Sequence, residues 1–107
     1  MTGPVDQKIT NLLSMAQRAR RLASGAFAVE QAMKEGQAAF LLIAADAEEE
    51  SKRKYKKLVA EFAIPYAEGL TREALGACIG KEYRAAAALL DKGFAKKLQS
   101  LIETDEL

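Results

Sequence analysis

The stretch RRLASGAFAVEQAMKEG, Arg20–Gly36, contains the start and the end of a helix directly behind two arginines. Ser24 is expected to cap this helix, because its hydroxyl can accept a hydrogen bond from a backbone N–H of the first turn. Gly36 is expected just past the helix end, since glycine enters the left-handed region at little cost. A helix start with Gly25 and nearby arginines is suited to an anion, although ordinary capping explains the same pattern.

The rest of the chain alternates between helical patterns and short apolar runs. One apolar face predicts a helix over residues 5–19, after a loose end at residues 1–4. Residues 21–23 are a candidate short strand, and the helix after it is expected to bury Val29, Ala32 and Met33. The continuous apolar runs at 38–44 and 85–90 predict strands that are covered on both faces.

Three further helices and one more strand complete the prediction. Asp46, Thr71 and Asp91 are expected to cap the helices, and residues 64–67 form a candidate strand. Pro65 lacks an N–H group, so it should lie at a strand start or a sheet edge. This alternation predicts an α/β fold, with a sheet covered by helices on both faces.

The size and composition indicate one small intracellular domain over residues 1–107. The chain has a single cysteine, no signal-peptide core and no apolar run long enough to span a bilayer. We therefore expect a cytoplasmic protein that does not contact a membrane. The net charge is +1, but three of the 15 acids lie in the acidic tail at 103–107, so 16 bases face 12 acids over residues 1–102.

The sequence offers no recognisable catalytic constellation. It contains no histidine, no phosphate-binding glycine loop and no cysteine or histidine spacing suited to a metal. Cys78 lies on the apolar face of a predicted helix, where it is expected to be a small core residue. We therefore predict a protein that is not an enzyme and that needs no cofactor or metal.

Acidic residues followed by bases characterise the helix after Asp46. The SKRKYKK run resembles a nucleic-acid patch, but each upstream glutamate has a base four residues later, which favours a solvated helix face. The predicted pairs are Glu48–Lys52, Glu49–Arg53 and Glu50–Lys54.

Three turns, at 24–25, 44–46 and 80–84, are expected to gather at one end of the sheet. Backbone N–H groups, lysines and arginines at such an end would hold phosphates. Phe27 and Tyr83 would pack against unstacked bases, although Phe27 is equally well explained as a core residue.

The chain resembles the kink-turn RNA-binding superfamily of ribosomal proteins, the large-subunit seven-Ae type, and most of all its small bacterial members of the YlxQ kind. The resemblance runs from about Asp6 to Ile102 and rests on NLLSMAQRARRLASG, AAFLLIAADAEEESKRK and IPYAEGLTREALGACIGKEYRAAAALLDKGFAKKL in that order. It implies a three-layer α/β/α sandwich around a central mixed four-stranded sheet. It also implies RNA recognition by the start of the second helix and nearby loops, in particular the loop at 79–84.

At the positions where strong kink-turn binders carry asparagine, glutamate and lysine, this chain has an apolar step followed by Gln31. Two hypotheses follow. The first is a monomeric protein that binds ribosomal or kink-turn-like RNA, with ribosomal proteins as neighbours on an assembled ribosome. The second is a protein-interaction module that has lost kink-turn binding. The predicted RNA-binding residues are Arg20, Arg21, Gly25, Ala26, Phe27, Ala28, Gln31, Asp46, Gly80, Lys81, Tyr83 and Arg84.

Overall fold

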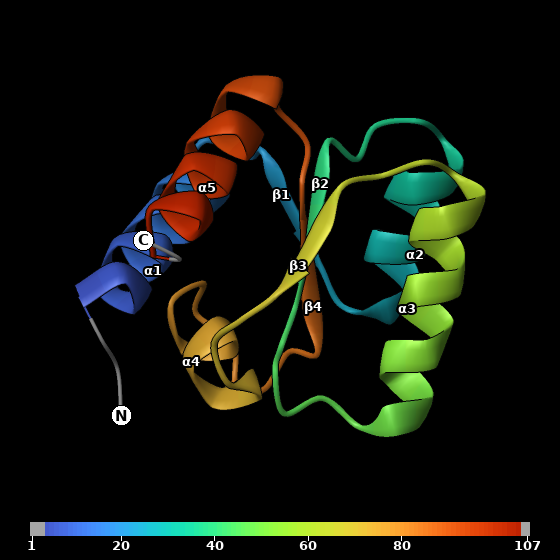
Figure 1. The fold of residues 1–107 in the computed structure, drawn as a ribbon, viewed down its shortest axis with the longest axis horizontal. Coiled ribbons are helices and arrows are strands. Elements are labelled where there is room, and N and C mark those ends of the chain that lie inside the picture. The colour runs from blue at the N-terminus through green and yellow to red at the C-terminus, as the bar shows by residue number, and fades with distance from the viewer. Residues whose placement is uncertain (1–3, 106–107) are drawn as a thin grey trace.

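The computed structural model describes residues 4–105 as helices and strands in alternation around one sheet (Figure 1). The first helix begins at a proline, which suits a first turn because its missing N–H group would have no helical partner there. The elements are α1 (Pro4–Arg18), β1 (Leu22–Ser24), α2 (Ala26–Lys34), β2 (Phe40–Ile43), α3 (Glu49–Glu61), β3 (Tyr66–Glu68), α4 (Arg72–Ala77), β4 (Ala86–Leu89) and α5 (Lys92–Asp105).

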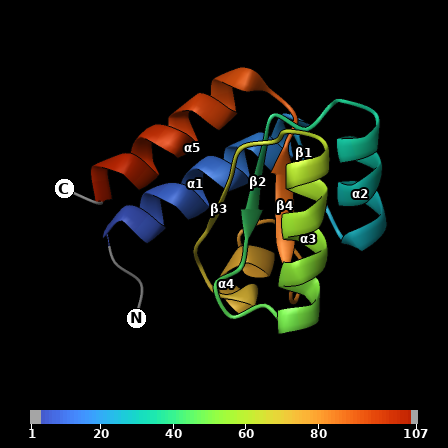
Figure 2. The ribbon, with the colours of Figure 1, turned by 45° about the vertical axis from the view of Figure 1, so that its right-hand side comes forward.

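The four strands form a mixed sheet with the order β1-β4-β2-β3. β4 pairs antiparallel with both β1 and β2, whereas β2 and β3 are parallel. Helices α1, α4 and α5 cover one face, and α2 and α3 cover the other (Figures 1 and 2). The three-layer α/β/α sandwich with a mixed four-stranded sheet is therefore confirmed.

The two central strands, β2 and β4, form the middle of the core. Every residue of both strands is buried, as the continuous apolar runs predict, because helices cover both of their faces. β3 lies at the sheet edge directly after Pro65, so the expected position of that proline is also confirmed. From α2, the core receives Val29, Ala32 and Met33 as predicted.

Two helix boundaries follow the predicted local signals. The Thr71 hydroxyl accepts a hydrogen bond from Ala74 N at 3.0 Å and caps α4. The Asp91 carboxylate accepts one from Gly93 N at 2.8 Å at the start of α5. Gly36 follows α2 with a φ of 73°, as expected for a glycine that ends a helix.

Two predicted caps are wrong. Ser24 belongs to β1, and Gly25 is the N-cap of α2, with no side-chain cap bond in the described part of the chain. The strand is the physical reason, because pairing of Ser24 with Ala87 keeps the serine in extended backbone. Asp46 does not cap α3, whose N-cap is Glu48. Asp46 instead accepts a hydrogen bond from the first residue of α4.

Both chain ends are more helical than predicted. Pro4 begins α1 instead of belonging to a loose end, while the remainder of that predicted end, residues 1–3, lies outside the described residues. The acidic tail, predicted to fray after Ile102, continues α5 to Asp105, and residues 106–107 lie outside the described part. Among the helices described, none has the length and apolar character needed to cross a membrane.

The predicted ion pairs along α3 do not form in the described structure, since its lysines bind acids of neighbouring elements. Lys52 and Lys56 both contact Glu68 of β3, at 3.2 and 2.9 Å. Lys54 contacts Glu30 of α2 at 3.1 Å. These bridges join α3 to its neighbours, so the helix face that the sequence assigned to solvent is partly an inter-element contact.

Candidate nucleic-acid interface

Four loops meet at one end of the sheet, which we call the loop end. β1, β2 and β3 all finish there and β4 begins there, because Ser24 and Leu42 both pair with Ala87 and Ile43 pairs with Glu68. The loop end therefore contains the β1–α2, β2–α3, β3–α4 and α4–β4 connections (Figure 1). The predicted gathering of the turns at 24–25, 44–46 and 80–84 is confirmed.

The start of α2 forms the first part of the loop end. Gly25 has φ 88° and ψ 146°, a backbone conformation that L side chains rarely adopt. Ala26, Phe27 and Ala28 follow it and are all exposed, with Phe27 82% accessible to solvent. The side chains at this helix start are thus apolar, while its first-turn N–H groups point out of the helix end.

Gln31, one turn further along α2, is engaged within its own helix. Its amide donates a hydrogen bond to the Glu35 carboxylate at 2.6 Å. The amide is exposed, so it can be turned toward a ligand at the expense of this exposed bond.

The α4–β4 loop forms the second part of the loop end and packs directly against α4. Lys81 N donates a hydrogen bond to Gly76 O at 2.8 Å. Gly76 is buried, and a Cβ atom at this position would lie 2.4 Å from Glu82 O. Only a glycine permits this approach, which leaves Lys81 exposed and Tyr83 62% exposed.

Arg84 closes this loop against β4. Its backbone N–H donates to Arg72 O at 3.1 Å, and its Nη1 donates to Tyr83 O at 2.8 Å. The Nε atom is buried and has no hydrogen-bond partner among the described atoms. The guanidinium therefore lies along the loop, with hydrogen-bonding capacity left unused.

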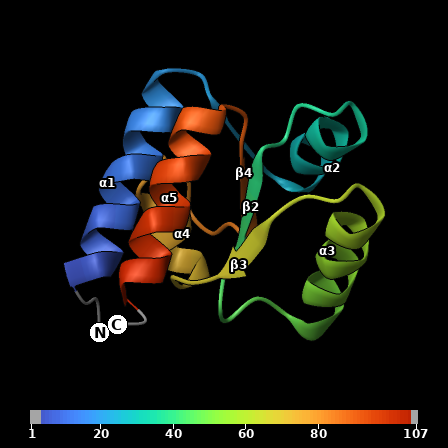
Figure 3. The same cartoon turned by 45° about the horizontal axis from the view of Figure 1, so that its top comes forward.

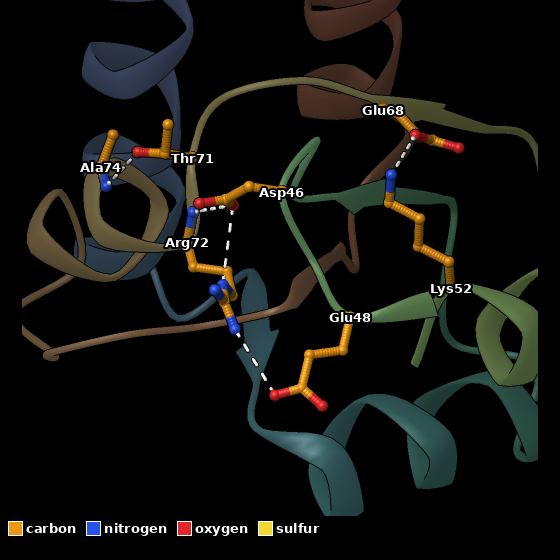
Figure 4. A network of polar contacts seen from close by, with 7 residues as sticks. All are labelled: Asp46, Glu48, Lys52, Glu68, Thr71, Arg72 and Ala74. Atoms are coloured by element: carbon orange, nitrogen blue, oxygen red, sulfur yellow. Dashed lines mark hydrogen bonds and ion pairs between the residues drawn. The ribbon is translucent and has the colours of Figure 1, made fainter. Parts of the chain in front are cut away.

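An acid–base network supports the third part of the loop end (Figure 4). Asp46 Oδ1 accepts a hydrogen bond from Arg72 N at 2.7 Å and lies 3.7 Å from Arg72 Nε. Arg72 Nη1 lies 3.7 Å from a Glu48 carboxylate oxygen. Asp46 thus ties the β2–α3 loop to the start of α4, a role that the sequence analysis missed together with Arg72.

Arg20 and Arg21 are not at the loop end. Arg21 O accepts a hydrogen bond from Leu90 N at 2.9 Å, which places this residue where β4 finishes. The three residues of β1 lie between the arginines and Gly25, and an extended strand of that length spans about 10 Å. The sequence pattern predicts these arginines beside Gly25, and the strand between them is the reason that they lie apart.

The loop end offers contacts to a ligand but no reactive group that we can identify. The described residues contain no group of three or more potential metal ligands. Burial raises the pKa of the Cys78 thiol to about 11, so the thiol remains protonated at neutral pH. Cys78 is only partly buried and packs against the core from its edge, where its thiol donates a hydrogen bond to Leu75 O at 3.2 Å.

Comparison with known proteins yields a family and two named relatives. Residues 7–99 match the model of the Ribosomal protein L7Ae/L30e/S12e/Gadd45 family. The chain is 36% identical over 92 residues to the RNA-binding protein YlxQ of Bacillus subtilis (strain 168), covering 86% of this chain and 92% of that protein. It is 33% identical over 97 residues to the RNA-binding protein YlxQ of Enterococcus faecium, covering 91% and 93%. The predicted resemblance is confirmed, and so is the prediction of a protein that is not an enzyme.

Two solved structures share the fold. A protein of unknown function from Bacillus halodurans superposes with a TM-score of 0.84 at 34% identity, covering 90% of this chain and 97% of that one. A 15.5kD RNA binding protein of Giardia lamblia superposes with a TM-score of 0.78, covering 99% and 91%. At 17% identity, the second similarity concerns the fold alone.

Proposed function

The chain belongs to the Ribosomal protein L7Ae/L30e/S12e/Gadd45 family, and from this premise we propose that it binds structured RNA through the loop end of its sheet. The observation that carries the proposal is the convergence there of the α2 start with the exposed Lys81–Tyr83 segment. The relatives named as RNA-binding proteins in two bacteria support the choice of ligand.

The proposed contacts divide into phosphate contacts and base contacts. First-turn N–H groups of α2 and the Lys81 ammonium hold backbone phosphates, because both present positive charge or donors to an anion. Phe27 and Tyr83 are exposed by 82% and 62%, so their rings are free to stack on bases that have left a helix. Arg84 supplies further charge once its guanidinium turns from Tyr83 O toward the RNA.

We further propose the kind of RNA. Ala26 and Ala28 cannot donate or accept side-chain hydrogen bonds, so this surface selects shape and unstacked bases more than base edges. Kink-turns and other bulged ribosomal RNA elements present such bases. The protein would act on them as a monomer in the cytoplasm, and ribosomal proteins would be its neighbours if the RNA belongs to a ribosome.

The test is a titration at two salt concentrations against a kink-turn duplex, a fully paired duplex and total cellular RNA. We expect preference for the kink-turn duplex. Lys81→Ala should lower the salt slope by about one, as loss of one phosphate contact does. Phe27→Ala should cost about 1–3 kcal/mol of binding free energy if one base stacks on the ring. Lys96→Ala, an exposed lysine of α5 outside the loop end, is the matched control and should change neither quantity.

Equal binding of the paired and kinked duplexes would remove the shape selectivity from the proposal. Absence of binding to every RNA at low salt would refute RNA binding itself. An effect of Lys96→Ala as large as that of Lys81→Ala would show that general charge, and not the loop end, holds the RNA.

The exposure of Phe27 also favours a second function, a protein-interaction module on the same fold. The ring is flanked by two exposed alanines, and such an apolar step suits a protein surface. The titration distinguishes the two functions, since a protein that binds only through this apolar step would be insensitive to Lys81→Ala and would show no salt-dependent affinity for RNA.

A further inference from the structure

Helices α1 and α5 lie side by side (Figures 1–3). An open groove is formed between side chains of these two helices. It has a volume of about 390 Å³. Its apolar floor includes Met15, which is 43% exposed and is one of the four exposed large hydrophobic side chains among the described residues. The groove is lined by Lys8, Asn11, Leu12, Met15, Lys97, Ser100 and Leu101.

The spacing of the lining residues follows both helices. Lys8, Leu12 and Met15 lie on one face of α1 at helical intervals, and Lys97 and Leu101 do the same on α5. Of the apolar lining residues, Leu12 is 4% exposed and belongs to the core and Leu101 packs against it, whereas Met15 is exposed. Met15 is therefore the side chain through which the groove offers exposed apolar surface to a partner.

The charge of the groove has one sign. Lys8 and Lys97 are its only charged lining residues, and both are exposed. Neither takes part in an ion pair within the described residues. A partner that places apolar side chains on the floor and carboxylates beside the two lysines would complement both properties of the groove.

We propose that the α1–α5 groove is a docking site for an acidic amphipathic helix of a partner protein. A helix fits because a groove between two packed helices accepts a third by the same interdigitation of side chains. Methionine suits such a surface, since its flexible thioether adapts to different apolar neighbours. A second copy of this chain fits less well, because a symmetric contact centred on the groove would bring its lysines together, and RNA offers nothing to cover the apolar floor.

This proposal goes beyond the proposed RNA binding and uses different residues. The lining residues all belong to α1 and α5, whereas the loop end is built from the β1–α2, β2–α3, β3–α4 and α4–β4 connections. RNA and the partner helix can therefore occupy the protein together. Failure of one proposal leaves the other unaffected.

The experiment uses two-dimensional NMR of the isotope-labelled full chain with two synthetic probe peptides. The first peptide forms an amphipathic helix with leucines on one face and glutamates on the other, and the second has lysines in place of the glutamates. We expect the acidic peptide to shift signals of the groove lining and to bind at least tenfold more tightly than the basic peptide. The double variant Lys8→Glu/Lys97→Glu should lose that preference, and Met15→Gln should weaken binding of the acidic peptide.

Arg53→Glu/Lys57→Glu on α3 is the matched control, because it makes the same charge change on two exposed residues in the opposite layer. It should leave the peptide affinity within twofold of that of the unmodified protein. Equal binding of both peptides, or shifts that avoid the groove, would overturn the proposal. So would groove shifts caused by RNA, or groove shifts on raising the protein concentration together with a dimer in sedimentation.

Discussion

Replacement of Gly76 by alanine tests how the α4–β4 loop is positioned. The new Cβ would lie 2.4 Å from Glu82 O, 2.7 Å from Glu82 C and 3.0 Å from Tyr83 N. All three are backbone atoms, so no side-chain rotation relieves the contact. An ordinary carbon–oxygen contact of this type begins at about 3.3 Å, so the loop must move by nearly 1 Å.

The energetic effect combines three contributions. Overpacking in a filled site costs about 1–3 kcal/mol. Weakening of the 2.8 Å bond from Lys81 N to Gly76 O costs about 0.5–1.5 kcal/mol more. Alanine recovers about 1 kcal/mol because it favours helical backbone over glycine. The expected net loss of unfolding free energy is therefore about 0.5–3.5 kcal/mol.

Urea denaturation followed by circular dichroism measures this loss, with Gly69→Ala as the matched control. A Cβ atom at Gly69 would meet only the Leu42 Cδ1 atom at 3.8 Å, so its free energy of unfolding should change little. Gly76→Ala should also weaken RNA binding, because the displaced loop contains Lys81 and Tyr83. Wild-type stability and wild-type RNA affinity in Gly76→Ala would refute the inference that this glycine allows the α4–β4 loop to pack against α4.

Three further predictions concern single side chains. Asp46→Ala should cost about 1–2 kcal/mol of unfolding free energy by removing the acceptor for Arg72 N, and Asp46→Asn should recover part of it in the same urea assay. Burial raises the pKa of the Cys78 thiol from its ordinary 9.0 to about 11, so this thiol ionises first in the unfolded chain. The free energy of unfolding should therefore fall as the pH rises from about 9 to about 11, and Cys78→Ala should show a smaller fall. Hydrogen bonds from Lys56 first and Lys52 second hold the pKa of Glu68 below its ordinary 4.5, so the contribution of Glu68 to stability is lost as the pH falls below that value. Glu68→Gln should lose less stability on acid titration, and at neutral pH it should cost below about 1 kcal/mol of unfolding free energy.

The fold was predictable because its strongest signals are local. The runs at 38–44 and 85–90 are apolar without alternation, which requires cover on both faces, and β2 and β4 are buried throughout. Thr71 and Asp91 satisfy backbone N–H groups two or three residues away. Signals of this range can be identified from the sequence without knowing the arrangement of the elements.

The errors come from contacts between distant segments. Arg72 lies 26 residues from Asp46, so capping rules, which concern residues close in the sequence, do not predict the hydrogen bond from Arg72 N to the Asp46 carboxylate. Lys52 and Lys56 of α3 pair with Glu68 because β3 lies beside β2 at the sheet edge. Arg21 and Gly25 are neighbours in the sequence, yet a short strand separates them by the height of the sheet. The position of a binding surface depends on such arrangements more than the fold class does.

The position of β4 in the sheet has a consequence for synthesis of the protein. β4 is the last strand in the chain but lies between β1 and β2. Until Ala86–Leu89 have been made, β1 has no strand to pair with, and the β1–α2 and α4–β4 connections cannot be brought together. A nascent chain therefore cannot assemble the complete loop end before β4 has been translated.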